Sequence, residues 1–250
     1  MTLGATVIAT SLKMYFGFDQ TLAWVAEIAS LEIPADTELI VVPSFLAIPA
    51  VIDRVRGLRI GVGGQNLSPE DAGAFTGEVS GAQLREIGCG FVEVGHAERE
   101  RLFGESETDI AAKIAAAWRN GLTPILCIGE PEPGDAQTAA AWCARKLTRL
   151  LDAAGPRPGD LIVAYEPVWA IGAEVAASVD HITTVATALR RTLAERDVPR
   201  DARIIYGGSA GVGLLSQLGA SVDGLFLGRF AHDPNALGSI LGERSATARH

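Results

Sequence analysis

The chain has 250 residues, with 21 Lys and Arg against 30 Asp and Glu, which gives a formal net charge of −9 at pH 7. This acidic balance argues against nucleic acid as the main partner, because phosphate backbones are bound by basic surfaces. Hydrophobic residues make up 48% of the chain and charged residues 20%, a composition that excludes a largely disordered protein.

No apolar run reaches the roughly 18 residues that a membrane-spanning helix needs, and the N-terminus lacks the basic segment of a secretory signal. The three cysteines, Cys89, Cys127 and Cys143, form no CxxC pair, so neither a disulfide framework nor a zinc site is indicated. We therefore expect a cytoplasmic protein without membrane contact. Cys127 and Cys143 are expected to be buried and unreactive.

Short apolar, β-branched runs alternate with longer segments of helical periodicity. Eight runs predict strands, at 5–9, 38–42, 58–62, 90–94, 123–128, 161–165, 203–206 and 224–227. Helices are predicted most clearly at 108–119, 137–154 and 179–196, and Ser106 or Thr108 suits the N-cap of the first. The segment at 155–159 is typical of a turn before the sixth strand.

Near-continuous apolar strands with intervening helices predict a parallel sheet that is covered by helices. Eight such units fit a closed (β/α)8 barrel, which typically has about 250 residues. A doubly wound α/β sheet is the alternative from pattern alone. Because no linker divides the chain, we expect residues 1–250 to form a single barrel domain.

Polar side chains follow several of these strands, where the catalytic residues of such barrels lie. Lys13 follows the first predicted strand, His96 the fourth and Glu166 the sixth. Each has an ordinary explanation when taken alone: a solvated loop cation, a satisfied core histidine, or an acceptor for a nearby helix. Together, on one rim, they predict a site with a cation, an electrophile and a general base.

The segment GGSAGVG at 207–213 follows the seventh predicted strand. Glycines let the backbone approach an anion closely, and a helix that begins just beyond adds its positive end. In barrels, phosphate sites often form from the loops after the seventh and eighth strands. A phosphate-bearing ligand is therefore predicted.

Five segments carry a family resemblance: QNLSPEDAGAFTGEVSGAQL at 65–84, VGHAER at 94–99, NGLTPILCIGE at 120–130, AYEPVWAIG at 164–172 and IIYGGS at 204–209. Through them the chain resembles the triosephosphate isomerase family over nearly its full length. The resemblance implies a TIM barrel and an aldose–ketose isomerase of glycolysis and gluconeogenesis. Such an enzyme interconverts dihydroxyacetone phosphate and D-glyceraldehyde 3-phosphate through an enediolate, without metal or organic cofactor.

The resemblance also implies residue roles. Glu166 matches the general base, His96 the neutral imidazole that donates to the enediolate, and Lys13 the lysine that stabilises negative charge, while Glu98 matches a supporting acid beside the histidine. Residues 167–177 match a lid over the substrate. The implied substrate-binding residues are Ser11, Lys13, Gly172, Ser209, Gly228 and Arg229. Loop 65–79, with Thr76 near its tip, matches a loop that inserts into a neighbouring subunit, which implies a homodimer.

The sequence departs from the family pattern in the surroundings of these residues. Ser11 stands where the family usually has Asn, and Ala97 where it usually has Ser. The second half of the lid is Ala-Glu-Val at 173–175 instead of Thr-Gly-Lys, and Arg229 replaces the second glycine of a pair. The Arg229 guanidinium could reach a phosphate, or it could point outward and touch nothing.

These departures leave two other hypotheses open. The first is a paralogue that isomerises a four-carbon sugar phosphate such as an erythrulose phosphate, with Ser11 making room. The second is a phosphate-ligand-binding barrel without turnover. The remaining histidines, His181, His232 and His250, are expected on the surface or in the tail.

Overall fold

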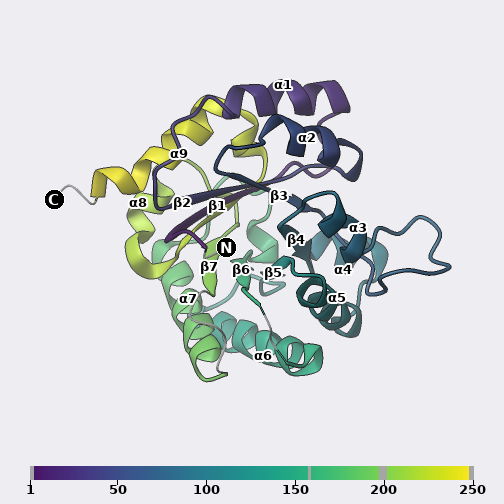
Figure 1. The fold of residues 1–250 in the computed structure, drawn as a ribbon. Helices are drawn as coiled ribbons and strands as arrows, with labels where there is room; N and C mark the ends of the chain where they lie inside the picture. Colours follow the sequence, from purple (N-terminus) through teal and green to yellow (C-terminus); the bar gives the residue numbers. More distant parts are fainter. Residues whose placement is uncertain (1–2, 157–158, 197–201, 248–250) are drawn as a thin grey trace.

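The computed structural model describes residues 3–156, 159–196 and 202–247, which contain a closed barrel of parallel strands in chain order (Figure 1). Neighbouring strands pair in parallel all the way round, from β1 with β2 to β8 with β1. The strands are β1 Thr6–Ser11, β2 Thr37–Val42, β3 Ile60–Gly64, β4 Phe91–Val94, β5 Thr123–Ile128, β6 Ile162–Tyr165, β7 Arg203–Tyr206 and β8 Gly224–Leu227. The predicted (β/α)8 barrel is confirmed, and closure of the sheet excludes the doubly wound alternative.

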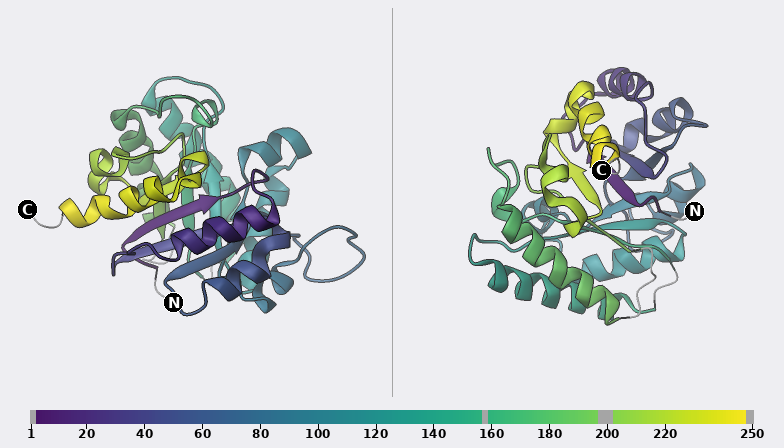
Figure 2. Two further views of the ribbon diagram at one scale, coloured as in Figure 1. Left: turned by 90° about the horizontal axis from the view of Figure 1, so that it is seen from above. Right: turned by 90° about the vertical axis from the view of Figure 1, so that its left-hand side faces the viewer.

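Helices surround this barrel, as both views in Figure 2 show. They are α1 Phe18–Ile28, α2 Ile48–Arg54, α3 Gly81–Glu86, α4 Ala97–Phe103, α5 Glu107–Arg119, α6 Ala136–Ala154, α7 Val179–Ala194, α8 Leu214–Leu218 and α9 Pro234–Thr247. Ser106 caps α5 in a capping box with Asp109, as expected for one of the two predicted caps. No helix in the described ranges is long and apolar enough to cross a bilayer.

Two strands, β1 and β3, differ from the prediction by two residues at an end, and the other strand ends agree within one residue. β1 continues to Ser11, which pairs with Val42, so Ser11 belongs to the strand and not to the loop after it. β3 begins at Ile60, two residues late, and ends in Gly63 and Gly64, whose low strand propensity concealed that end. α7 ends at Ala194 instead of 196. Part of the predicted turn at 155–159, residues 157–158, lies outside the described residues.

The core has two apolar layers, one inside the barrel and one between the strands and the helices. Alternation along β1 sends Val7 and Ala9 inward and Ile8 outward. By the same period of two, Ser11 faces the interior at the carboxyl end of β1. The interior layer consists of Leu3, Val7, Ala9, Ile40, Val42, Phe91, Ile125, Cys127, Ile162, Ala164, Ile205 and Phe226. Above this layer, the strand ends leave room for a site.

Candidate active site

A cavity of about 580 Å³ opens at the carboxyl ends of the strands. It is lined by residues of β1 and β8 and of the segments that follow β1, β4, β6, β7 and β8. Its lining includes nearly all of the site residues expected from the sequence, namely Ser11, Lys13, His96, Glu98, Glu166, Gly172, Ser209, Gly228 and Arg229. The structure therefore brings these separate segments together around one space.

Lys13 is held in a constrained position just after β1. Its backbone has φ +47°, in the left-handed region that side-chain-bearing residues seldom adopt. Gln65 Nε2 donates to the Lys13 carbonyl oxygen at 2.8 Å, and Lys13 Nζ lies 2.8 Å from Glu98 Oε1. Burial opposes charge on the ammonium, but the hydrogen bond to Glu98 and its negative charge outweigh burial and raise the Lys13 pKa above 10.5. The site therefore holds a permanent cation.

His96 is the N-cap residue of α4, and this position fixes its tautomer. Its Nδ1 accepts a hydrogen bond of 3.1 Å from the backbone N–H of Glu98. Burial, and secondarily the charge of Lys13, lower the His96 pKa from 6.5 to about 4, against the opposing charge of Glu98. The ring is therefore neutral near pH 7, with its proton on Nε2. This Nε2 is buried without a partner among the described residues, so it is free to donate to a ligand.

Glu166 follows β6 directly and is two residues beyond the inward-facing Ala164. Its side chain is buried, and its Oε2 atom lacks a hydrogen-bond partner in the described residues. Burial, and then the negative charge of Glu93, raise the pKa of this carboxyl from 4.5 to about 8, which Cys127 and Lys13 oppose. A carboxylate with a raised pKa is a stronger base than an ordinary glutamate.

The residues expected to hold a phosphate lie on the loops after β6, β7 and β8. Ser209 has φ +52°, and its hydroxyl lies 2.8 Å from the carbonyl oxygens of Ala170 and Ala173 in the lid. Ser209 thus joins the β7 loop to the lid. The helix α8 that follows has only five residues, so its positive end is weaker than the sequence pattern suggested.

Arg229 lines the cavity and does not point away from it. A β-carbon built on Gly172 of the lid would lie 3.7 Å from Arg229 Nη2, so the guanidinium reaches the lid. Among the described residues no carboxylate forms an ion pair with it. Arg229 is therefore an exposed cation at the cavity rim, with its guanidinium close to the lid.

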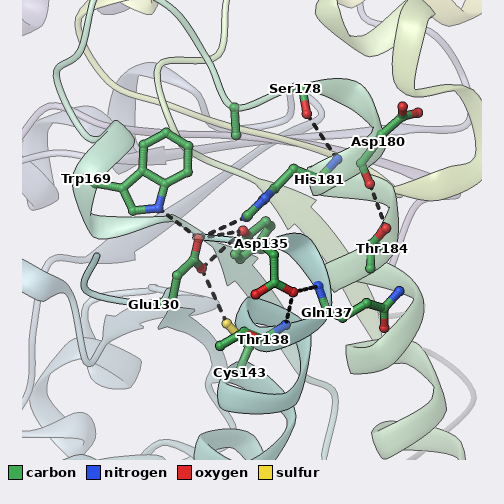
Figure 3. A network of polar contacts seen from close by, with 12 residues as sticks. Glu130, Asp135, Gln137, Thr138, Cys143, Trp169, Ser178, Asp180, His181 and Thr184 are labelled. Atoms are coloured by element: carbon green, nitrogen blue, oxygen red, sulfur yellow. Dashed lines mark hydrogen bonds and ion pairs between the residues drawn. The ribbon is translucent and has the colours of Figure 1, made fainter. Parts of the chain in front are cut away.

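The first arm of the lid is anchored by the buried carboxylate of Glu130 (Figure 3). Glu130 Oε1 accepts from Trp169 Nε1 at 2.9 Å and lies 3.0 Å from His181 Nε2. Tyr165 Oη and Cys143 Sγ donate to the same carboxylate, at 3.1 and 3.6 Å from Oε2. His181 is therefore buried in this network, and its expected surface position is wrong. The sequence concealed this contact because its partner lies 51 positions away.

The second arm of the lid is held from β7. The backbone N–H of Ala177 donates to the Tyr206 hydroxyl at 3.0 Å. Both groups are buried, so this hydrogen bond is shielded from water. The lid segment 167–177 is thus fixed near both ends, and Ser209 holds its middle through Ala170 and Ala173.

The structure also shows where the cysteines, His232 and Thr76 lie. Cys127 and Cys143 are buried, and burial raises both thiol pKa values above 9.0, as expected for unreactive cysteines. His232 is half-buried and its ring lies against Phe16, whereas His250 is outside the described residues. Thr76 does not line the cavity, because residues 72–78 lie exposed on the loop that projects from the barrel (Figure 1).

Two charged residues near the site were not singled out from the sequence. Arg101 on α4 lines the cavity and acts electrostatically on His96 and Glu98. Glu93 lies inside the barrel on β4 with a nearly fully buried side chain. A signal for Glu93 was present, since a carboxylate in an otherwise apolar strand is unusual for a barrel interior.

Comparison with known proteins agrees with this geometry. A family model for triosephosphate isomerase matches residues 6–244. The chain is 50% identical over 244 residues to the L-erythrulose-1-phosphate isomerase of Pectobacterium atrosepticum, covering 94% of each chain. It is 38% identical over 242 residues to the triosephosphate isomerase of Symbiobacterium thermophilum, covering 94% of each. It is 40% identical over 246 residues to that of Pseudomonas putida, covering 94% of this chain and 96% of the relative. The chain therefore belongs to the triosephosphate isomerase family and is a sugar-phosphate isomerase, an intramolecular oxidoreductase.

Proposed function

We propose that this isomerase acts on a four-carbon ketose phosphate, an erythrulose phosphate, through an enediolate with Glu166 as the base. The observation that carries the reaction is the pairing of two free groups in one cavity. Glu166 Oε2 and His96 Nε2 lie 3.9 Å apart, and both lack partners among the described residues. One is suited to take a proton from carbon, and the other to donate a hydrogen bond to the adjacent oxygen.

The roles follow from these environments. Glu166 removes the proton from the carbon next to the carbonyl, and the electron pair of that C–H bond becomes the enediolate double bond. The carbonyl oxygen gains negative charge, which His96 Nε2–H and the Lys13 ammonium stabilise. Glu166 then returns the proton to the former carbonyl carbon. The hydroxyl proton of the first carbon passes to the former carbonyl oxygen, so the carbonyl group now lies on the carbon that was deprotonated. One carbon is oxidised and its neighbour reduced, so the reaction needs no external oxidant and no organic cofactor.

Gly172, Ser209, Gly228 and Arg229 are proposed to hold the phosphate. Their loops surround the rim of the cavity, and Arg229 supplies an unneutralised positive charge there. Lys13 adds a second cation from β1. Closure of the lid over the phosphate would exclude water from Glu166 and strengthen it as a base.

Two observations favour a four-carbon substrate over a triose. The chain is 50% identical to a protein named L-erythrulose-1-phosphate isomerase and 38–40% identical to the named triosephosphate isomerases above. Ser11 is also shorter than the usual Asn and lines the cavity. Erythrulose 1-phosphate differs from dihydroxyacetone phosphate by one CH₂OH group, attached to the carbon that loses its proton. The same base and the same enediolate therefore serve both substrates.

Interconversion of dihydroxyacetone phosphate and D-glyceraldehyde 3-phosphate, in glycolysis and gluconeogenesis, is the second candidate. It is favoured by the presence of Lys13, His96 and Glu166 in one cavity, since nothing in this set requires a fourth carbon. A non-catalytic phosphate-binding barrel would not need an unpartnered base beside an unpartnered imidazole, so it explains less of the site.

The test is a steady-state assay of purified protein on both erythrulose phosphates and on D-glyceraldehyde 3-phosphate. A kcat/KM for erythrulose phosphate that exceeds the value for the triose supports the proposal. Faster turnover of the triose would assign the enzyme to the second candidate. No turnover of any of these substrates would favour the binding barrel.

We also propose that residues 1–250 form one domain and that two copies form a homodimer through loop 65–79. The loop tip projects from the barrel, and several large apolar side chains are exposed, among them Met14 at 93%, Leu46 at 86% and Phe103 at 70%. Exposed apolar groups of this size are typical of interaction surfaces. Light scattering on the purified protein tests this, and a monomer mass would contradict it. A cytoplasmic location remains an expectation from the sequence.

A further inference from the structure

Glu93 is a buried carboxylate for which neither the fold nor the proposed reaction gives a role. It lies on β4, two residues after the interior residue Phe91, and therefore faces the inside of the barrel. Only 4% of the residue is exposed, and its Oε2 atom has no hydrogen-bond partner in the described part of the chain. A buried carboxylate oxygen without a partner is costly, so its presence here points to a ligand or a functional neighbour.

The Ser11 side chain lies beside this carboxylate. Burial raises the pKa of Glu93 from 4.5 to about 7. The Ser11 hydroxyl and the positive charge of Lys13 act in the opposite direction. Ser11 lines the cavity, whereas Glu93 lies behind it and does not. The Ser11 Oγ atom is buried and, like Glu93 Oε2, has no partner of good geometry among the described residues. An unpartnered hydroxyl at the cavity wall thus lies in front of an unpartnered carboxylate oxygen.

Both groups lie deeper in the barrel than the proposed phosphate site. Ser11 and Glu93 belong to strands, whereas Gly172, Ser209 and Arg229 lie in loops or turns beyond the strand ends. β4 stands opposite β8 in the closed strand order, so Glu93 lies across the barrel from Arg229. A substrate with its phosphate at the rim therefore directs its far end inward. In erythrulose 1-phosphate, the CH₂OH group is at that end.

We infer that Ser11 and Glu93 form the subsite for the terminal hydroxymethyl group of a four-carbon substrate, an inference that rests on the proposed function. Ser11 is the contacting residue, and Glu93 is a positioning residue behind it. With the substrate bound, the Ser11 hydroxyl donates its proton to Glu93, which leaves an Oγ lone pair for the substrate. The substrate hydroxyl donates to that lone pair. A triose phosphate has no hydroxymethyl group at this position and cannot make the contact.

A different effect of Glu93 has to be separated from recognition. Its negative charge also raises the pKa of Glu166, a carboxyl that is further influenced by Cys127 on β5, Lys13 after β1 and Glu98 on α4. A change in the strength of the base alters the rate for every substrate, because each loses its proton to the same carboxylate. Recognition of the hydroxymethyl group alters only the four-carbon substrate. The ratio of the two kcat/KM values therefore isolates recognition.

The experiment measures kcat/KM of the wild type, Glu93→Leu and Glu93→Gln on erythrulose phosphate and on D-glyceraldehyde 3-phosphate. We expect Glu93→Leu to lower the four-carbon to three-carbon ratio by about 10- to 100-fold, with a rise in KM for the four-carbon substrate, because a charge-assisted hydrogen bond is lost. Glu93→Gln keeps an acceptor for the Ser11 proton and should restore much of the ratio. Phe91→Leu, one layer deeper on the same strand, is the matched control and should leave the ratio unchanged.

The outcomes separate the two proposals. If the wild type fails on erythrulose phosphate, the proposed substrate is wrong and the subsite falls with it. If the wild type turns it over but Glu93→Leu changes both substrates by the same factor, the proposed function stands and the subsite is overturned. An equal change in the ratio for Phe91→Leu would also overturn it, because the effect would then come from general repacking of the interior.

Discussion

His96 Nε2 lies 3.9 Å from Glu166 Oε2, and neither atom has a hydrogen-bond partner among the described residues. The backbone N–H of Glu98, at the start of α4, donates to the other ring nitrogen of His96. The position of Glu166 is set by β6, which ends at the preceding residue. Two buried groups of complementary function are thus directed at the same space. This pair can act on a carbon and on the oxygen of its neighbour at once.

Shortening the base by one methylene tests its position. Glu166→Asp withdraws the carboxylate by about 1 Å, and a displacement of this size can lower the rate about 100-fold. We expect a fall of that order in kcat with a smaller change in KM, because the phosphate contacts remain. Steady-state kinetics on the preferred substrate checks this, with circular dichroism as the control for folding. An unchanged kcat would remove Glu166 from the mechanism.

The pH profile reports the environment of the same residue. Glu166 acts as a base only when it is deprotonated, and burial together with Glu93 raises its pKa to about 8. The value of kcat/KM should therefore fall as the pH decreases below this region, about tenfold per pH unit. His96 adds no step near pH 6.5, since burial and Lys13 lower its pKa to about 4.

The negative charge of Glu93 provides a control for the pH dependence of kcat/KM. Glu93→Gln removes a negative charge that opposes ionisation of Glu166, so the step in kcat/KM should move to lower pH. Lys13, Cys127 and Glu98 continue to act on the carboxyl in both proteins. A wild-type step near the ordinary glutamate pKa of 4.5, or a step that Glu93→Gln moves upward, would contradict the account.

Substitution of Ser11 by the residue usual in the family tests the size of the cavity. Asn is longer than Ser and would occupy the space that we assign to the hydroxymethyl group. Ser11→Asn should therefore lower kcat/KM for erythrulose phosphate relative to D-glyceraldehyde 3-phosphate. Thr10→Val is the control, because Thr10 is a buried residue of the same strand that faces away from the interior. A ratio that is unaltered by Ser11→Asn would count against the assignment.

Gly207, at the start of the loop after β7, leaves space for the Glu166 side chain. A β-carbon at this position would lie 2.5 Å from Cγ of Glu166, a distance at which one of the two must move. We expect Gly207→Ala to displace the carboxylate and to lower kcat by about 10- to 100-fold. Gly134→Ala is the matched control, since a β-carbon there meets no atom within 4 Å. Equal activity of the two variants would contradict a positional role for Gly207.

Tyr206 tests the lid without touching the reacting groups. Tyr206→Phe removes the acceptor of the Ala177 N–H and leaves a buried donor unpaired at the end of the lid. Loss of this bond costs about 1–3 kcal/mol, so kcat/KM should fall by about 5- to 150-fold. Because the lid is proposed to close over the phosphate that both substrates share, the fall should be similar for the four-carbon and three-carbon compounds. A fall confined to one of them would place Tyr206 in substrate selection instead.

The barrel and its strand order were predictable from the sequence because buried parallel strands and amphipathic helices have distinct periods. Lys13, His96 and Glu166 could be placed on one rim because they follow strands, and parallel strands end at the same face. The direction of a side chain was harder to predict. The Arg229 guanidinium reaches Gly172 of the lid and His181 joins the Glu130 network, and both placements depend on segments far away in the chain. Glu93 was missed although a carboxylate within an apolar strand was a visible signal, because the sequence alone does not show what surrounds it inside the barrel.

In the proposed reaction, Glu166 removes a proton from the carbon beside the carbonyl of an erythrulose phosphate. Incubation of this substrate with the enzyme in D₂O, followed by proton NMR, measures that step directly. We expect the wild type to replace the hydrogen on that carbon with deuterium and Glu166→Gln to leave it in place, because the amide cannot accept it. Failure of the wild type to exchange this hydrogen, under conditions in which it exchanges that of dihydroxyacetone phosphate, would contradict the account.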